Sequence, residues 1–200
     1  MLAGYIPRMI IVVLALALTG ACAQDRRKVE RTNQGLGDNA KLRALYEQDQ
    51  ADRSGGSDSI DWTLVNQRDS LRRERVRELL DSNEVRTSED YRHAAMIFQH
   101  GSDTTAARLA HELAQQAVGL DSTNASAKWL LAASWDRYQM RLGKPQWYGT
   151  QYVKDSENGP WRLYDIDTTA VSDHARRQLG VPTLEEARAR VEEFNRPSDE

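Results

Sequence analysis

The chain of 200 residues contains a single cysteine, Cys22, and only one long run of apolar residues. Because there is no second cysteine, no disulfide can form within the chain, and the fold must be stable through packing alone even in an oxidising compartment. The apolar run, Met9 to Leu18, has ten residues and is too short to span a bilayer. Any stable attachment to a membrane would therefore need lipid chains on the protein.

The chain also lacks an excess of basic residues, with 27 Lys and Arg against 30 Asp and Glu. Because nucleic acids are bound by net basic surfaces, the composition argues against a nucleic-acid partner. The arginine-rich stretch 68–77 is interleaved with Asp69, Glu74 and Glu78. We interpret it as the solvated, salt-bridged face of a helix. The opposite, apolar face is expected to contain Leu64, Val65, Leu71, Val76, Leu79 and Leu80.

Most sequence signatures of catalysis are missing as well. There is no G-x-S-x-G motif. Residues 111–115 begin like a zinc-protease helix, but Gln115 stands where the second histidine is required. His93 and His100 are seven residues apart, about 10 Å along a helix, which is too far for one shared ion. The sequence therefore predicts no metal and no cofactor, and no motif identifies a nucleophile.

What the chain does have is a cysteine directly after its apolar run. Arg8 is the only charged residue ahead of Cys22, small residues precede the cysteine, and the polar stretch 24–28 follows it. This pattern is typical of a secretory signal and resembles the bacterial lipoprotein box, with Leu18 four residues before the cysteine where three is usual. Ordinary cleaved secretion and an uncleaved anchor are the alternatives.

The lipoprotein hypothesis divides the chain into a signal peptide (1–21), a lipid-anchored flexible tether (22–39) and a folded domain (40–196). Cys22 would carry the lipid, palmitate included, and would attach the protein to the membrane of the bacterial cell envelope. Ala23, rather than an aspartate, follows the cysteine. By resemblance to lipoprotein sorting, this implies the outer membrane, facing the periplasm, if the host has two membranes.

Periodicity and capping signals predict a mainly α fold. Helices are expected over about 40–53, 62–82, 87–99, 104–118, 125–142, 173–179 and 183–195. The junction around 117–124 resembles that of a tetratricopeptide-type helical hairpin, but no second copy follows at the same period. The aromatic runs 146–153 and 161–166 predict a C-terminal β-hairpin. We expect a single domain of five to six helices, including one tetratricopeptide-like hairpin, plus that β-hairpin.

Two polar residues conflict with their helical surroundings. Asp136 shares a stripe with Trp129, Ala133 and Met140, so its carboxylate is expected to be buried and to need a partner. His100, Arg53 and the hairpin are the candidate partners. A structural role is the simpler interpretation of both residues: an ion pair or cap for Asp136, and a helix C-cap for His100.

Four short motifs resemble the signature of a bacterial domain family of unknown function. They are Asp49-Gln50 with Arg53, Gln99-His100, Asp136-Arg137, and Gln146-Trp147-Tyr148-Gly149-Thr150-Gln151. These match D-Q-x-x-R, Q-H, D-R and Q-x-Y-G-T-Q, and the resemblance covers about 40–182. It brings no established activity, and implies only that these polar residues gather in one site.

We therefore expect an envelope lipoprotein that binds an unknown small molecule or envelope protein between helices 87–99 and 125–142 and the hairpin. The candidate ligand-binding residues are Asp49, Arg53, Arg137, Gln146, Tyr148, Thr150 and Gln151.

Two alternatives use the chain differently. In an envelope hydrolase, His100 would be a general base held by Asp136, and these two are the candidate catalytic residues. In a protein-interaction module, the helical hairpin would present an apolar groove. That groove would expose Leu109, Leu113, Trp129 and Leu130.

Overall fold

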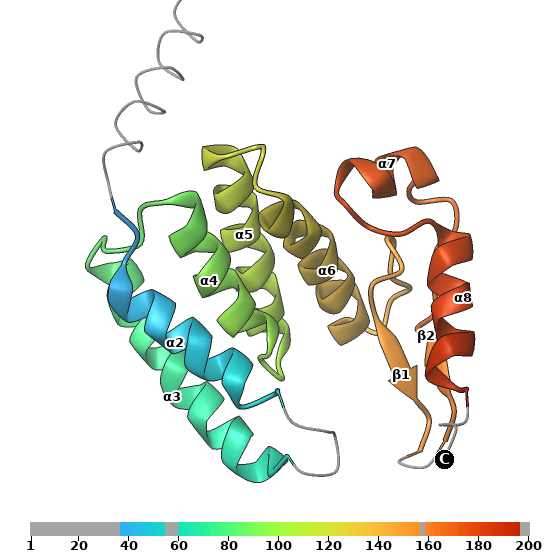
Figure 1. The fold of residues 1–200 in the computed structure, drawn as a ribbon, viewed down its shortest axis with the longest axis horizontal. Coiled ribbons are helices and arrows are strands. Elements are labelled where there is room, and N and C mark those ends of the chain that lie inside the picture. The colour runs from blue at the N-terminus through green and yellow to red at the C-terminus, as the bar shows by residue number, and fades with distance from the viewer. Residues whose placement is uncertain (1–36, 55–59, 157–158, 197–200) are drawn as a thin grey trace, which may run out of the picture. The chain divides into compact units, whose positions relative to one another are not determined.

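The computed structural model describes residues 37–54, 60–156 and 159–196, and Figure 1 shows their arrangement. This part of the chain forms the helices α2 (Ala40–Ala51), α3 (Trp62–Asp81), α4 (Ser88–Gln99), α5 (Thr104–Leu120), α6 (Ala125–Arg141), α7 (Asp173–Gln178) and α8 (Leu184–Phe194), with strands β1 (Tyr152–Lys154) and β2 (Trp161–Leu163). The mainly α class with a C-terminal β-hairpin is confirmed. Each of the seven expected helical ranges is a described helix, so the overall estimate of five to six helices is too low. The expected signal peptide and nearly all of the tether lie outside the described residues.

Side-chain caps set where the helices begin. At each of the seven starts, an Asn, Asp, Ser or Thr side chain accepts a backbone N–H of the first turn. Thr87 with Asp90, and Thr183 with Glu186, form complete capping boxes. These are local signals, so the predicted helix bounds agree with the structure to within about two residues. No described helix is long and apolar enough to cross a membrane.

The hydrophobic core lies where α4 packs against α2, α5 and α6. Small side chains let the helices approach closely, and the largest fully buried apolar side chains are Phe98, Leu42, Ile97 and Leu130. Burying each of these stabilises the fold by roughly 1.5–3 kcal/mol. The helical hairpin expected from the 117–124 junction is formed by α5 and α6, which pack along each other.

The apolar face predicted for α3 is partly wrong. Val65, Val76 and Leu79 are buried, but Leu64 and Leu71 are 40% and 62% exposed. Asp69 and Arg72 occupy the buried stripe between Val65 and Val76 instead, because both make ion pairs inside the domain. The arginine-rich helix is therefore solvated on most of its surface and ion-paired on its inner face.

The C-terminal hairpin is shorter than predicted. β1 pairs antiparallel with β2, with Tyr152 opposite Leu163, and β2 packs beside α8 (Figure 1). The expected strand over 146–153 is wrong for its first six residues, where only the single bridge of Gln146 to Ile166 remains. The backbone N–H groups of Trp147, Tyr148, Thr150 and Gln151 are bound to side chains and are not available to a strand partner.

Candidate functional site

Asp136 on α6 holds the irregular segment before β1. Its Oδ1 accepts the backbone N–H groups of Trp147 (2.8 Å) and Tyr148 (2.9 Å). Its Oδ2 accepts the backbone N–H (3.0 Å) and the hydroxyl (2.8 Å) of Thr150. The carboxylate is fully buried and all of these donors come from one turn of chain. Burial raises the pKa of Asp136, and the backbone N–H donors oppose that rise.

Two glutamines close the same segment. Gln146 Nε2 donates to the carbonyls of Gln151 (3.0 Å) and Tyr164 (2.9 Å), and its Oε1 accepts the Gln151 N–H (2.9 Å). Gln151 Nε2 donates to the carbonyl of Ala133 on α6 (3.2 Å) and to Thr150 Oγ1 (2.9 Å). Both glutamines are buried. Of the ligand-binding candidates, Gln146, Thr150 and Gln151 therefore use their polar atoms within the domain.

Arg176, on the short helix α7, completes this arrangement. Its guanidinium donates to the carbonyls of Trp147 (2.8 Å) and Tyr148 (3.1 Å) and pairs with Asp173 (3.1 Å). Asp136 thus binds the N–H groups of a turn whose carbonyls are bound by Arg176. No sequence motif marks Arg176 as a site residue. We define Asp136, Gln146, Thr150, Gln151 and Arg176 as the turn clamp.

A second polar group lies where the end of α2 meets the end of α4. Asp49 is fully buried and accepts from Arg53 (2.9 Å), Gln50 (2.8 Å) and the Nδ1 of His100 (3.0 Å). Arg53 also pairs with Asp69 of α3. We call Asp49, Arg53 and His100 the histidine corner.

The histidine corner continues into a ladder of ion pairs between α2 and α3. Asp69 pairs with both Arg53 and Arg72, and Arg72 pairs in turn with Asp52, which also binds Arg68 (2.7 Å). The hydrogen bond from Arg72 lowers the pKa of Asp52. The sequence pattern indicated ion pairs on α3 but not their partners on α2.

His100 therefore has a different partner from the one expected. Among the described residues it forms no hydrogen bond with Asp136, whose oxygens are occupied by the turn clamp. It pairs with Asp49 instead and is the C-cap residue of α4. Because a carboxylate accepts, the Asp49 contact places a proton on Nδ1 and leaves Nε2 without a hydrogen-bond partner among the described residues. The side chain is 20% exposed.

Arg137 and Tyr148 are the remaining candidates. Arg137 lies on α6 next to Asp136, and its guanidinium Nε is buried without a hydrogen-bond partner among the described residues. Burial and the nearby charge of Arg141 lower the pKa of Arg137 to about 10. Tyr148 is half-buried, and burial raises the pKa of its hydroxyl. Of the candidate residues, Asp49, Arg53 and His100 therefore lie together in the histidine corner. Asp136, Gln146, Thr150 and Gln151 belong to a separate network, the turn clamp.

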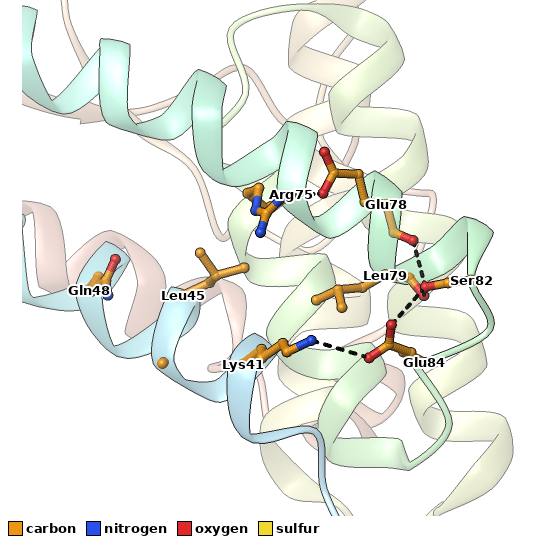
Figure 2. A pocket seen from close by; sticks show the side chains of 9 residues that line it. Lys41, Leu45, Gln48, Arg75, Glu78, Leu79, Ser82 and Glu84 are labelled. Atoms are coloured by element: carbon orange, nitrogen blue, oxygen red, sulfur yellow. Dashed lines mark hydrogen bonds and ion pairs between the residues drawn. The ribbon is translucent and has the colours of Figure 1, made fainter.

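A groove of about 460 Å³ runs between α2 and α3 (Figure 2). Leu45 and Leu79 line it, and the Lys41–Glu84 ion pair lies at one end. A second groove of about 410 Å³ on the same two helices is lined partly by Asp52, Arg68 and Arg72. Neither groove is lined by a sequence-predicted site residue.

The apolar residues of the α5–α6 hairpin are mostly used inside the domain. Leu113 and Leu130 are buried and Leu109 is half-buried, whereas Trp129 is 40% exposed. Within the part of the chain that the structure describes, no group of three or more His, Cys, Asp or Glu side chains is arranged to hold a metal ion.

Comparison of the chain with known protein families, curated proteins and solved structures finds no match. The resemblance of the four motifs to a family signature stays a prediction. A function is therefore inferred from the geometry of the histidine corner and its surroundings.

Proposed function

We propose that this chain is a membrane-anchored lipoprotein of the bacterial cell envelope whose folded domain binds a small polar ligand at the histidine corner. The observation that carries the proposal is the contact of His100 Nδ1 with the fully buried Asp49 at 3.0 Å. This contact fixes the ring and its tautomer, and it leaves Nε2 without a partner among the described residues. An oriented, partly exposed imidazole is suited to bind a polar group of a ligand.

The pairing at Asp49 supports a role beyond packing. Asp49 already accepts from Arg53 and Gln50, so its burial is compensated without the histidine. Arg53 is itself held by Asp49 and Asp69. The imidazole is therefore positioned by a network that spans α2, α3 and α4, which is what a preorganised binding group requires.

Ligand binding can be tested with the full-length protein in detergent micelles. The protein is incubated with the small-molecule fraction extracted from the host envelope, and retained compounds are identified by mass spectrometry. The native protein should retain a compound that His100→Ala does not. The matched control is His174→Ala, which changes an exposed histidine on α7 and should behave like the native protein. Identical retention by the native and His100→Ala proteins would contradict the proposal.

The anchor is tested separately. Cells expressing the native chain and Cys22→Ala are fed a clickable fatty acid, and the label on the protein is measured after fractionation. We expect label and membrane association for the native chain and neither for Cys22→Ala. Equal label on both chains would rule out Cys22 as the lipidated residue.

The Asp49–His100 contact also favours a second candidate, an envelope hydrolase. His100 Nε2 would act as a general base, with Asp49 as the positioning residue in place of the Asp136 first expected. The test is turnover of p-nitrophenyl acetate and p-nitrophenyl phosphate. A hydrolase would lose kcat in His100→Ala, and Asp49→Asn would lower kcat and shift its pH profile. No turnover above the His100→Ala background would reject hydrolysis of these two substrates.

A further inference from the structure

We propose that Arg137 binds an anionic group of the ligand, a carboxylate or a phosphate, beside the histidine corner. This inference rests on the proposed binding function and specifies the chemistry of the ligand. It is carried by the position of Arg137 on α6 and by the lack of any counter-charge for it among the described residues.

Arg137 lies one helical turn from each of two residues of α6 that contact the end of α4. Residues four apart lie on the same face of a helix, so Ala133, Arg137 and Arg141 follow one another along α6. The carbonyl of Ala133 accepts from Gln99 Nε2 at 3.1 Å, and Arg141 Nη2 donates to the carbonyl of Gly101 at 3.3 Å. Arg137 lies midway between these contacts. Both contacts join this stretch of α6 to the end of α4, where His100 lies between Gln99 and Gly101.

Arg137 has no counter-charge among the described residues. Arg53, Arg72, Arg92 and Arg176 are also largely withdrawn from solvent, and each forms an ion pair with at least one carboxylate. Arg137 forms none with the described residues, and its Nε is buried with no acceptor. A guanidinium presents five donors in a plane and binds carboxylate or phosphate through two parallel hydrogen bonds. Of these five arginines, Arg137 is therefore the one without a carboxylate partner among the described residues.

The charged residues near Arg137 do not neutralise it. Arg141 is the charged group that acts on Arg137, and it adds repulsion instead of neutralising it. The buried carboxylate next in sequence, Asp136, is fully used by the turn clamp. A bound oxyanion would supply the missing charge and accept from the guanidinium.

The test measures the thermal stability of the full-length protein in detergent micelles. Sodium acetate and sodium phosphate are added in separate series up to 50 mM, with sodium chloride adjusting every sample to one ionic strength. The native protein should gain several degrees in Tm with at least one of the two anions, and the responding series distinguishes carboxylate from phosphate. Arg137→Met should show no gain. Arg108→Met, which changes an exposed arginine on α5, is the matched control and should respond like the native protein.

Two results would overturn the inference. One is an equal gain in Arg137→Met, which would place the anion elsewhere. The other is no gain with either anion in the native protein, as expected if Arg137 and the unpartnered Oε1 of Gln99 satisfy each other directly.

The retention experiment separates this inference from the proposed function. If His100→Ala loses the retained compound and Arg137→Met keeps it, ligand binding at the histidine corner is supported and the proposed role of Arg137 is rejected. If neither variant changes retention, the proposed function falls as well.

Discussion

Asp136 and Arg137 are neighbours on α6 with opposite surroundings. The carboxylate has four donors from a single turn of chain, whereas the guanidinium has a buried Nε without an acceptor among the described residues. Buried charges are normally paired, and a charge left unpaired costs several kcal/mol. The structure therefore assigns Asp136 to the stability of the fold, while the unpaired Arg137 is the side chain that we propose for ligand binding.

Asp136→Asn should destabilise the domain by about 2–4 kcal/mol. The carboxylate accepts hydrogen bonds from N–H and O–H donors on both oxygens, whereas an amide would place its own NH₂ donor against some of them. Urea unfolding followed by circular dichroism measures the change. Asp165→Asn, which changes an exposed carboxylate beside Arg162, is the control and should shift stability by less than about 0.5 kcal/mol. Equal stabilities for native and Asp136→Asn would show that the turn clamp does not support the fold.

Arg137→Met should stabilise the ligand-free protein by about 1–3 kcal/mol, since methionine keeps much of the apolar stem and removes an unpaired charge. The pKa of about 10 expresses the same penalty, because burial disfavours the charged form. The quantity to compare is the urea midpoint of the two proteins without added anion. A lower midpoint for Arg137→Met would mean that the guanidinium already has a stabilising partner.

His93 should make the domain sensitive to mild acid. Burial, with the charge of Arg92, holds the pKa of His93 below its ordinary 6.5, although Glu89 at 3.3 Å acts in the opposite direction. The unfolded chain therefore takes up a proton before the folded protein does, so stability falls as pH drops through 6.5 toward the folded pKa.

His93→Phe keeps an aromatic ring stacked on Tyr46, which lies 4.3 Å away between centroids, and removes the titration. The difference in unfolding free energy between pH 7 and pH 5 should become smaller in this variant. His174→Phe, at an exposed position, should leave that difference unchanged. An unaltered pH dependence in His93→Phe would rule out His93 as a contributor.

At the scale of elements, the sequence predicts what local interactions determine. Helix bounds follow from caps such as Thr87 and Thr183, which act within three residues. The segment 146–151 alternates in the way a strand does, yet its N–H groups bind a carboxylate 11 to 14 residues earlier on α6. The partner of His100 lies 51 residues away on α2. Such pairings depend on helix packing, and periodicity along one element does not reveal them.

A substitution at Gly149 tests whether the turn held by the turn clamp can change its backbone conformation. It has a φ of +85°, and an added Cβ would lie 3.3 Å from Ile166 Cδ1. Gly149→Ala should therefore destabilise the domain by about 1–2 kcal/mol. Gly119→Ala on α5 is the matched control, since nothing lies within 4 Å of its added Cβ, and it should stabilise the helix by about 0.5–1 kcal/mol. A neutral Gly149→Ala in thermal unfolding would show that the turn can relax.

In the molecule as a whole, two separate polar networks hold different sets of elements together. The turn clamp joins α6 and α7 to the chain before β1, and the ion-pair ladder joins α2 to α3 and, through His100, to the end of α4. The four motifs were expected to gather in one site, but the structure distributes them between these networks. With Cys22 as the proposed lipid anchor, the histidine corner and Arg137 are the groups through which the folded domain would act.

The most direct test follows the side chains themselves by ¹H–¹⁵N NMR of the full-length protein in micelles. The ring nitrogens of His100 and the Nε–H of Arg137 are observed while the envelope small-molecule fraction is added at constant pH and ionic strength. Both signals should shift together, and the signals of the His174 ring nitrogens should stay in place. If the His100 and Arg137 signals remain fixed while the fraction is added, the histidine corner is not the ligand site.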